Sequence, residues 1–408
     1  INNSLYKTGG KYTMFSEKIV NDLKKSSGIR AMFEEGEKLR KIYGPENVFD
    51  FSLGNPDPEP PEAVKKTIRD LANASVSGDL HKYMPNAGFV DVREKIAQYI
   101  NKESGVSISA KNILMTCGAA GGLNVALKSL LNPEEEVIVF SPFFVEYLFY
   151  IGNHGGKGVI VPVNNETFEP DVAAFEAAIT PKTKAIIINS PNNPTGVVYS
   201  EEILKKLAQV IDKKQKEFNS TIFVLSDEPY TKIVYDGVVV PSVMKIFKNS
   251  LVITSFSKTL SLPGERIGYI AVNPEADNAD MLMDCLIFCN RILGFVNAPS
   301  MFQRVIADNL DTIVDNDIYK ERRDMLYNHL TKLGFSCIKP QGAFYLFPKT
   351  PIPDDVEFKN IAMKYNILVV PGSNFYCPGY VRLSYCVSTK LIENSLPAFE
   401  KLAKEFFK

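Results

Sequence analysis

One lysine in this chain lies among side chains that suit a phosphate group. Lys258 follows the hydroxyl residues Ser255 and Ser257, and Arg266 comes eight positions later. A lysine amine can form a Schiff base with an aldehyde, whereas hydroxyls and a forked guanidinium suit a phosphate ester. An aldehyde and a phosphate on one small molecule describe pyridoxal phosphate. Taken alone, S-x-S-K is short, and a polar turn with a solvated lysine explains it equally well.

The composition is typical of a globular protein of about two to three domains. The chain has 408 residues, of which 45% are hydrophobic and 23% charged. A net charge of −1 argues against a nucleic-acid partner, and no apolar run of about eighteen residues predicts a membrane span. The six cysteines lack C-x-x-C spacing and there are only three histidines, so no metal site is expected. This cysteine usage suits the reducing cytoplasm.

Seven short apolar runs between residues 111 and 273 predict the strands of one sheet. They are rich in β-branched residues, end in Gly, Pro, Asp or Ser, and alternate with helical stretches, which favours a mostly parallel sheet covered on both faces. Ligands of such sheets bind beyond the carboxyl ends of the strands. The runs are Asn112–Thr116, Val137–Phe140, Val159–Val163, Ala185–Asn189, Ile222–Leu225, Leu251–Thr254 and Ile267–Val272.

We expect a large domain over residues 58–300 and a smaller α+β domain over residues 301–408. From Met301 onward, charged helical patterns precede three further strand-like runs and a last helix. Residues 14–57, with helical periodicity over Ser16–Tyr43, are expected to join the small domain. Residues 1–13 are expected to be a mobile leader or cloning remnant.

Two more polar motifs follow predicted strands. In G-A-A-G-G, from Gly118, small residues let backbone N–H groups approach an anion at a helix N-terminus, although a tight turn would use the same residues. In N-N-P-T-G, Asn193 has an amide that could donate to a phenolic oxygen, although Asn, Pro and Gly also form plain turns.

An aspartate ends another predicted strand, in the motif S-D-E-P-Y. Asp227 at a buried strand end costs free energy unless it is paired, and a protonated pyridine nitrogen would be such a partner. Tyr230, three residues later, could reach the adjacent phenolic oxygen. An isolated aspartate at this place is more often a helix cap.

These motifs occur in one order, each at a strand end, and here the chain resembles the class I/II aminotransferases, which are fold-type I pyridoxal-phosphate enzymes. The resemblance extends from F-S-L-G-N-P at Phe51 to V-R-L-S at Val381. It implies an α/β fold in which a large domain has a mostly parallel seven-stranded sheet and a smaller domain is α+β. It also implies pyridoxal 5'-phosphate as cofactor.

The resemblance implies a role for each matching cofactor residue. Lys258 would carry the cofactor as a Schiff base and shuttle protons, while Asp227 would keep the ring nitrogen protonated. Asn193 and Tyr230 would bind the ring hydroxyl. Phe144 matches the aromatic that stacks on the ring, where many relatives have Trp or Tyr. The phosphate would be held by Gly118, Ala119, Ser255, Ser257 and Arg266, with Ala120 beside them.

Four residues match positions that concern substrate and assembly. Arg382 resembles the arginine that grips the substrate α-carboxylate, with Gly54 and Asn193 close by. Tyr83 resembles a tyrosine that reaches the cofactor phosphate of the neighbouring subunit, which implies a homodimer with shared active sites. Arg291 lies near the place of a second arginine in dicarboxylate-specific relatives, but one position off, so an exposed helix residue is an equal alternative.

The function that these matches imply is amino transfer from an L-amino acid, aspartate or an aromatic one, to a 2-oxo acid such as 2-oxoglutarate. The same motifs serve any cleavage at the α-carbon, so a β-C–S lyase or, more remotely, a decarboxylase remains an alternative. A non-enzymatic regulator on this scaffold would usually have a DNA-binding extension or lack the lysine, and Lys258 is present.

Overall fold

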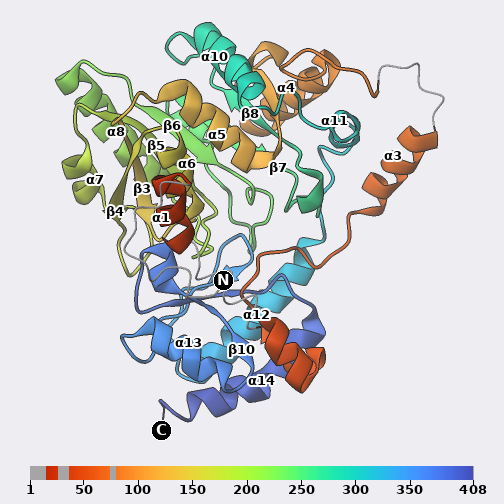
Figure 1. Cartoon of the computed structure of the whole chain (residues 1–408), viewed down its shortest axis with the longest axis vertical. Coiled ribbons are helices and arrows are strands. Elements are labelled where there is room, and N and C mark those ends of the chain that lie inside the picture. Colours follow the sequence, from red (N-terminus) through yellow and green to blue (C-terminus); the bar gives the residue numbers. More distant parts are fainter. Residues whose placement is uncertain (1–14, 26–35, 74–79, 408) are drawn as a thin grey trace.

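Two bodies of unequal size make up the molecule, with the smaller one at one end of the long axis (Figure 1). The structure is a computed structural model, and it describes residues 15–25, 36–73 and 80–407. The prediction of a leader over residues 1–13 concerns residues outside these ranges.

The large body is built on a seven-stranded sheet with the order β2-β8-β7-β6-β5-β3-β4. Only β8 runs antiparallel to its neighbours β2 and β7, so the prediction of a mostly parallel sheet is confirmed. The strands are β2 (Ile113–Thr116), β3 (Glu136–Ser141), β4 (Lys157–Pro162), β5 (Thr183–Asn189), β6 (Phe223–Asp227), β7 (Ser250–Ser255) and β8 (Gly268–Val272).

Both faces of this sheet are buried, which explains why its strands read as continuous apolar runs. In β5, Ala185 and Ile187 pack into a cluster with residues of α5, α6 and α10. The alternate residues Ile186 and Ile188 pack on the other face, against α7 and α8. Further along that second face, Ile113 and Ala271 pack against α3, α4 and α11.

Helices connect the strands, and several begin at a side chain that caps the first backbone N–H groups. Asp171 accepts from two backbone N–H groups at the start of α7, and the Ser200 hydroxyl accepts from one, that of Ile203, at the start of α8. The helices are α1 (Glu17–Lys25), α3 (Glu62–Asn73), α4 (Val90–Ser104), α5 (Gly118–Leu130), α6 (Glu146–Asn153), α7 (Val172–Ala178), α8 (Glu201–Phe218), α9 (Val243–Ile246), α10 (Ala279–Ile292), α11 (Ser300–Ala307), α12 (Asn316–Lys332), α13 (Asp355–Met363) and α14 (Thr389–Ala403). Short 3-10 turns are η2 (Pro45–Asn47), η3 (Ala110–Asn112), η4 (Pro263–Glu265) and η5 (Gly372–Phe375).

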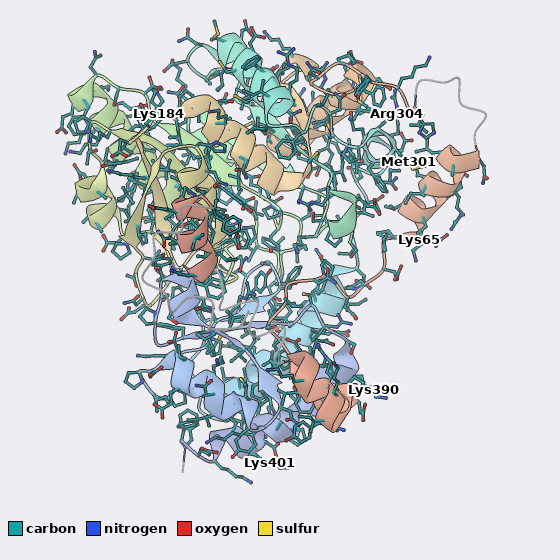
Figure 2. The ribbon with its side chains drawn as sticks, viewed as in Figure 1. Lys65, Lys184, Met301, Arg304, Lys390 and Lys401 are labelled. Atoms are coloured by element: carbon teal, nitrogen blue, oxygen red, sulfur yellow. The ribbon has the colours of Figure 1, made fainter. Side chains whose placement is uncertain are left out.

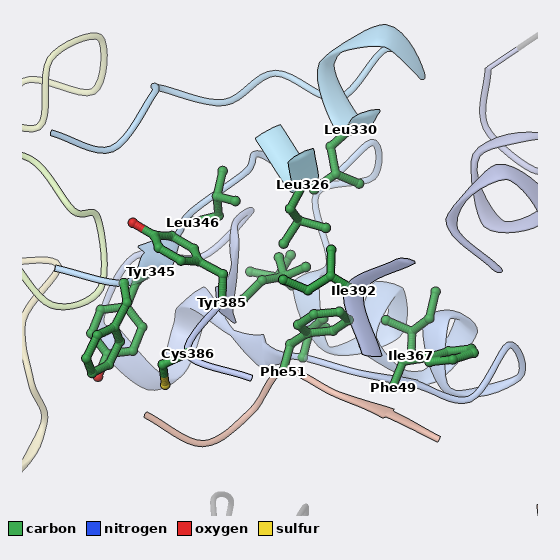
Figure 3. Close-up of a cluster of buried hydrophobic side chains, with 14 of the residues drawn as sticks. Phe49, Phe51, Leu326, Leu330, Tyr345, Leu346, Ile367, Tyr385, Cys386 and Ile392 are labelled. Atoms are coloured by element: carbon green, nitrogen blue, oxygen red, sulfur yellow. The ribbon is translucent and has the colours of Figure 1, made fainter. Parts of the chain in front are cut away.

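The small body has its own hydrophobic core, drawn in Figure 3. Strand β1 (Phe49–Asp50) pairs in parallel with β10 (Ile367–Leu368), and β11 (Val370–Pro371), β12 (Val381–Ser384) and β9 (Tyr345–Leu346) form an antiparallel sheet. Phe49 and Phe51 of the N-terminal segment pack there with Leu326 of α12 and Ile392 of α14.

Helix α11, which carries the labels Met301 and Arg304 in Figure 2, lies with the large body. Its Val305 and Ile306 are buried in the cluster that α3 and α4 share. The domain boundaries near residues 57 and 300 stay predictions. None of the helices in the described ranges is long and apolar enough to cross a membrane.

Candidate active site

Polar side chains from several segments of the chain meet in one cavity at the carboxyl ends of the parallel strands. The cavity has a volume of about 390 Å³, and both polar and apolar residues line it. Because β3, β5, β6 and β7 run parallel, the residues that follow them gather at one edge. The predicted site residues in its lining are Gly54, Ala119, Ala120, Phe144, Asn193, Asp227, Tyr230, Ser255, Ser257, Lys258, Arg266 and Arg382.

Lys258 lies three residues after the end of β7, with its amine buried in the cavity. The Nζ atom donates a hydrogen bond of 2.6 Å to the carbonyl oxygen of Gly54. Burial lowers the pKa of Lys258 to about 8; Cys386 opposes this shift, and the positive charges of Arg382 and Arg266 contribute less, in the lowering direction. A lysine with this pKa can hold or release a proton close to neutral pH.

Asp227, the last residue of β6, presents a half-satisfied carboxylate. Its Oδ2 atom accepts a 2.5 Å hydrogen bond from the hydroxyl of Tyr147 on α6. Its buried Oδ1 atom has no hydrogen-bond partner among the described residues. Burial raises the pKa of Asp227 to about 6, although the Tyr147 hydrogen bond opposes the rise. An unpaired acceptor of this kind calls for a donor from a bound molecule.

Two asparagines and an arginine are joined across the two bodies. Asn189, at the end of β5, donates from Nδ2 to the carbonyl oxygen of Asp227 (2.9 Å) and accepts from the backbone N–H of Asn193 (2.8 Å). Arg382 of β12 donates from Nη1 to Oδ1 of Asn193 (3.0 Å) and from Nη2 to the carbonyl oxygen of Ser52 (2.7 Å). Asn193 therefore links Arg382, through its side chain, to Asn189 at the end of β5, through its backbone N–H.

Two aromatic rings hold the guanidinium of Arg382, and one of its N–H donors remains unpaired among the described residues. It lies between the rings of Tyr345 and Phe375, with Cζ 4.7 and 4.8 Å from their centroids. Its buried Nε has no partner in the described part of the chain. A planar cation held in this way is suited to a carboxylate ligand.

The hydroxyl groups of Tyr230 and Tyr345 are buried and contact each other. Their Oη atoms are 2.9 Å apart. A Cβ atom at Gly54 would lie 2.2 Å from the Tyr345 hydroxyl, so only glycine allows this segment to approach Tyr345 so closely. Burial raises the pKa of Tyr230 well above its usual value, and that of Tyr345 to about 12, so both stay protonated near neutral pH.

The opposite end of the cavity is built to hold an anion. Gly118 starts α5 with φ +71°, and a Cβ there would meet Nη2 of Arg266 at 2.6 Å. Ala119 and Ala120 follow in the first turn, where helix N–H groups are free to donate. The helix thus starts at Gly118, at the first residue of the G-A-A-G-G motif.

Two predicted side chains, those of Tyr83 and Arg291, do not reach this cavity within one chain. Tyr83 is 91% exposed, and Arg291 lies exposed on α10, with its guanidinium 5.3 Å from the ring of Phe288. In turn, the structure adds Tyr147 and Tyr345, which the sequence reasoning missed. Tyrosine occurs 18 times in this chain, and no motif marks these two.

Comparison with known proteins decides the family of this fold and site. The profile described as "Aminotransferase class I and II" matches residues 46–399. The chain belongs to this family. Among curated relatives, it is 32% identical to aromatic-amino-acid aminotransferase 2 of Thermococcus litoralis over 90% of this chain and 96% of that protein. It is 33% identical to aspartate aminotransferase of Thermotoga maritima, over 87% and 91%.

Solved structures agree with this family membership. An amino transferase from Eubacterium rectale superposes with a TM-score of 0.91 at 42% identity, covering 100% of this chain and 99% of that one. Aspartate aminotransferase from Thermus thermophilus with maleate gives a TM-score of 0.81 at 29% identity, over 92% and 96%. The fold-type I prediction is confirmed, and the protein is a pyridoxal-phosphate-dependent aminotransferase.

The side chains in the cavity fit this cofactor. The unpaired Oδ1 of Asp227 offers an acceptor for a ring N–H. The start of α5, with Ser255, Ser257 and Arg266 in the same lining, offers donors for a phosphate. Lys258 and Phe144 line the space between these two ends.

Proposed function

We propose that this aminotransferase moves the amino group of an aromatic or another L-amino acid to a 2-oxo acid. The observation that carries the proposal is Arg382, a buried guanidinium with an unpaired Nε that shares the cavity with Lys258 and Asp227. A guanidinium close to the lysine can bind the α-carboxylate of the amino donor and that of the 2-oxo acid acceptor, so it suits both half-reactions of amino transfer. Aspartate as donor and 2-oxoglutarate as acceptor stay predictions from the sequence.

The cavity residues that match the cofactor motifs each have a proposed task. When bound, pyridoxal phosphate supplies an aldehyde that takes up the amino group and a ring that accepts electrons. Asp227 would hold a proton on the ring nitrogen, and Tyr230 and Asn193 would donate to the ring hydroxyl. Phe144 would cover one face of the ring, while Ser255, Ser257 and Arg266 would fix the phosphate.

Lys258 is the proposed acid and base at the substrate. Its Nζ would remove the proton from the α-carbon, because a pKa of about 8 leaves an appreciable neutral fraction near neutral pH. Arg382 would fix the substrate carboxylate, and so orient the α-carbon toward this amine. Tyr345, which contacts both Tyr230 and Arg382, is proposed to position them.

The apolar part of the lining supports an aromatic donor. Leu53, Leu123, Val145 and Phe375 line the same cavity as Lys258. Burial of a large apolar side chain against such walls is worth about 1.5–3 kcal/mol. Relatives of this chain include proteins named for aromatic amino acids and for aspartate, so both donor classes belong in the test.

The test is a panel of amino donors added to the holoenzyme without acceptor. Following the cofactor absorption and the 2-oxo acid released, we expect phenylalanine and tyrosine to react, and a 2-oxo acid to restore the starting spectrum. Pyruvate and ammonia from cystathionine, formed without a 2-oxo acid, would instead establish β-elimination as the main activity. Absence of any reaction with the whole panel would refute the proposal.

We also propose that two copies share their active sites. Tyr83 supports this, because it is exposed while its segment is held in place. Asn297 donates to the carbonyl oxygen of Pro85 (3.0 Å), and Phe89 donates its N–H to Gln303 (3.0 Å). A rigid segment that presents a bare tyrosine suits a contact with a second copy.

Subunit mixing tests the shared site. A Lys258→Ala chain and a Tyr83→Phe chain, each impaired alone, should regain activity when refolded together, because the mixed dimer then holds one intact site. A monomeric enzyme with full activity would disprove sharing. A cytoplasmic location is likewise proposed, on the six free cysteines.

A further inference from the structure

Glu146 is a cavity residue that the functions assigned above leave unused. It is the first residue of α6, two positions after Phe144, and lines the same cavity as Lys258 and Arg382. Its side chain is half-buried and forms no hydrogen bond or ion pair within the described ranges. Burial raises the pKa of this carboxyl group. A half-buried carboxylate without a partner has a field that acts on whatever enters the cavity.

The remaining charges of the cavity are already engaged. The described lining contains three cations, Lys258, Arg266 and Arg382, which the proposed function assigns to the amino transfer, the phosphate and the α-carboxylate. Asp227 is bonded to Tyr147. For a substrate side chain, the only formal charge left in this lining is the negative charge of Glu146.

A purely structural role for Glu146 is the alternative. Acidic residues in the first turn of a helix interact favourably with its dipole, by about 0.3–1 kcal/mol. Glu201 has this position in α8, outside the cavity, where it forms an ion pair with Lys205. A structural carboxylate would affect stability only, whereas one that faces the substrate would affect discrimination between substrates.

We infer that Glu146 is a charge filter, which weakens the binding of donors and acceptors that carry a second carboxylate relative to neutral molecules of the same shape. The inference rests on the proposed function and narrows its substrate class to amino acids with an uncharged or cationic side chain. Like charges brought together in a site shielded from water repel more strongly than in solution. The inference also predicts that 2-oxoglutarate, which carries a second carboxylate, binds more weakly than a neutral 2-oxo acid of the same shape.

The experiment measures competitive inhibition by glutarate and by its monoamide, two molecules that differ mainly in one charge. With the holoenzyme and phenylalanine as donor, we expect the monoamide to bind better than glutarate. In Glu146→Gln, the inhibition constant of glutarate divided by that of the monoamide should fall by about tenfold. This change equals about 1.4 kcal/mol. Binding of the monoamide itself should change little.

Glu201→Gln is the matched control, because it also removes a carboxylate from the first residue of a helix but lies outside the cavity. Its ratio should equal that of the wild type. Glu146→Leu provides a second neutral variant if Glu146→Gln does not fold. An unchanged ratio in a folded Glu146 variant that still transfers amino groups would overturn the filter. A wild type that transfers no amino group from any donor would overturn the proposed function instead.

Discussion

Removal of one hydroxyl group from Tyr147 should change how the enzyme holds its cofactor. Tyr147 is 1% exposed, and its hydroxyl is the only group in the described structure that donates to the Asp227 carboxylate side chain. Tyr147→Phe therefore strands a buried carboxylate. A hydrogen bond to a charged group contributes about 1.5–3 kcal/mol, which corresponds to a rise of about one to two units in the pKa of Asp227.

That rise has a defined consequence for cofactor binding. The pKa of Asp227 is already raised to about 6, so a further rise leaves much of it protonated at neutral pH, where it can no longer accept from a ring N–H. We expect the dissociation constant of pyridoxal phosphate at pH 7 to increase about 2- to 10-fold, in proportion to the loss of the ionised carboxylate. The acidic limb of its pH dependence should move to higher pH.

The stability of the apoprotein provides a second measurement. A carboxyl that titrates near 3.8 when unfolded and at about 6 when folded binds more protons in the folded state between these values. The free energy of unfolding therefore falls as the pH rises through this window, by about 3 kcal/mol in total. Tyr147→Phe should extend the fall to higher pH, which urea titrations from pH 4 to 9 would show.

Tyr319→Phe is the control for loss of a buried hydroxyl. The Tyr319 hydroxyl has no hydrogen-bond partner among the described residues and lies in the core of the small body. This variant should bind the cofactor like the wild type. If the pH dependence of cofactor binding in Tyr147→Phe superimposes on that of the wild type, the assigned coupling between Tyr147 and Asp227 is wrong.

Three further substitutions probe the lysine, the phosphate end and the carboxylate site. Lys258→Met should abolish transfer yet stabilise the apoprotein at neutral pH by about 3 kcal/mol, because it removes a buried amine whose pKa is lowered from 10.5 to about 8; a less stable variant in urea titrations would contradict this. Gly118→Ala places a Cβ 2.6 Å from Nη2 of Arg266 at φ +71°, so cofactor affinity should fall about tenfold or more, as measured by equilibrium dialysis. Arg382→Ala should lower kcat/KM by about 30- to 1000-fold for every donor alike; a loss confined to one donor class in steady-state kinetics would argue against a common carboxylate site.

The fold was predictable because its strands can be recognised from short local sequence patterns. The run Ala185–Asn189 is apolar on both faces and ends in a turn motif, so its place in a covered parallel sheet follows from pattern alone. Asp227 and Lys258 could be found for the same reason, since each follows such a run within four residues. The order of the motifs then identified the cofactor.

The rest of the site depends on contacts between residues far apart in the chain. Tyr147 meets Asp227 across 80 positions, and Tyr230 meets Tyr345 across 115. Tyr147 and Tyr345 lie in no motif that marks them as site residues. Only the packing of α6 and of the small body brings these two side chains into the cavity. For Arg291, a local match was present but was one position off. One position along a helix rotates a side chain by about 100°, which is enough to turn it away from the cavity.

The direct test of the central claim is chemical reduction of the purified holoenzyme. Sodium borohydride treatment, proteolysis and mass spectrometry should place the pyridoxyl group on the peptide that contains Lys258. Lys258 is the one lysine in the described lining of the cavity that Asp227 and Arg382 share. A pyridoxyl group on any other lysine, or a protein that retains no pyridoxyl group after reduction, would contradict the account.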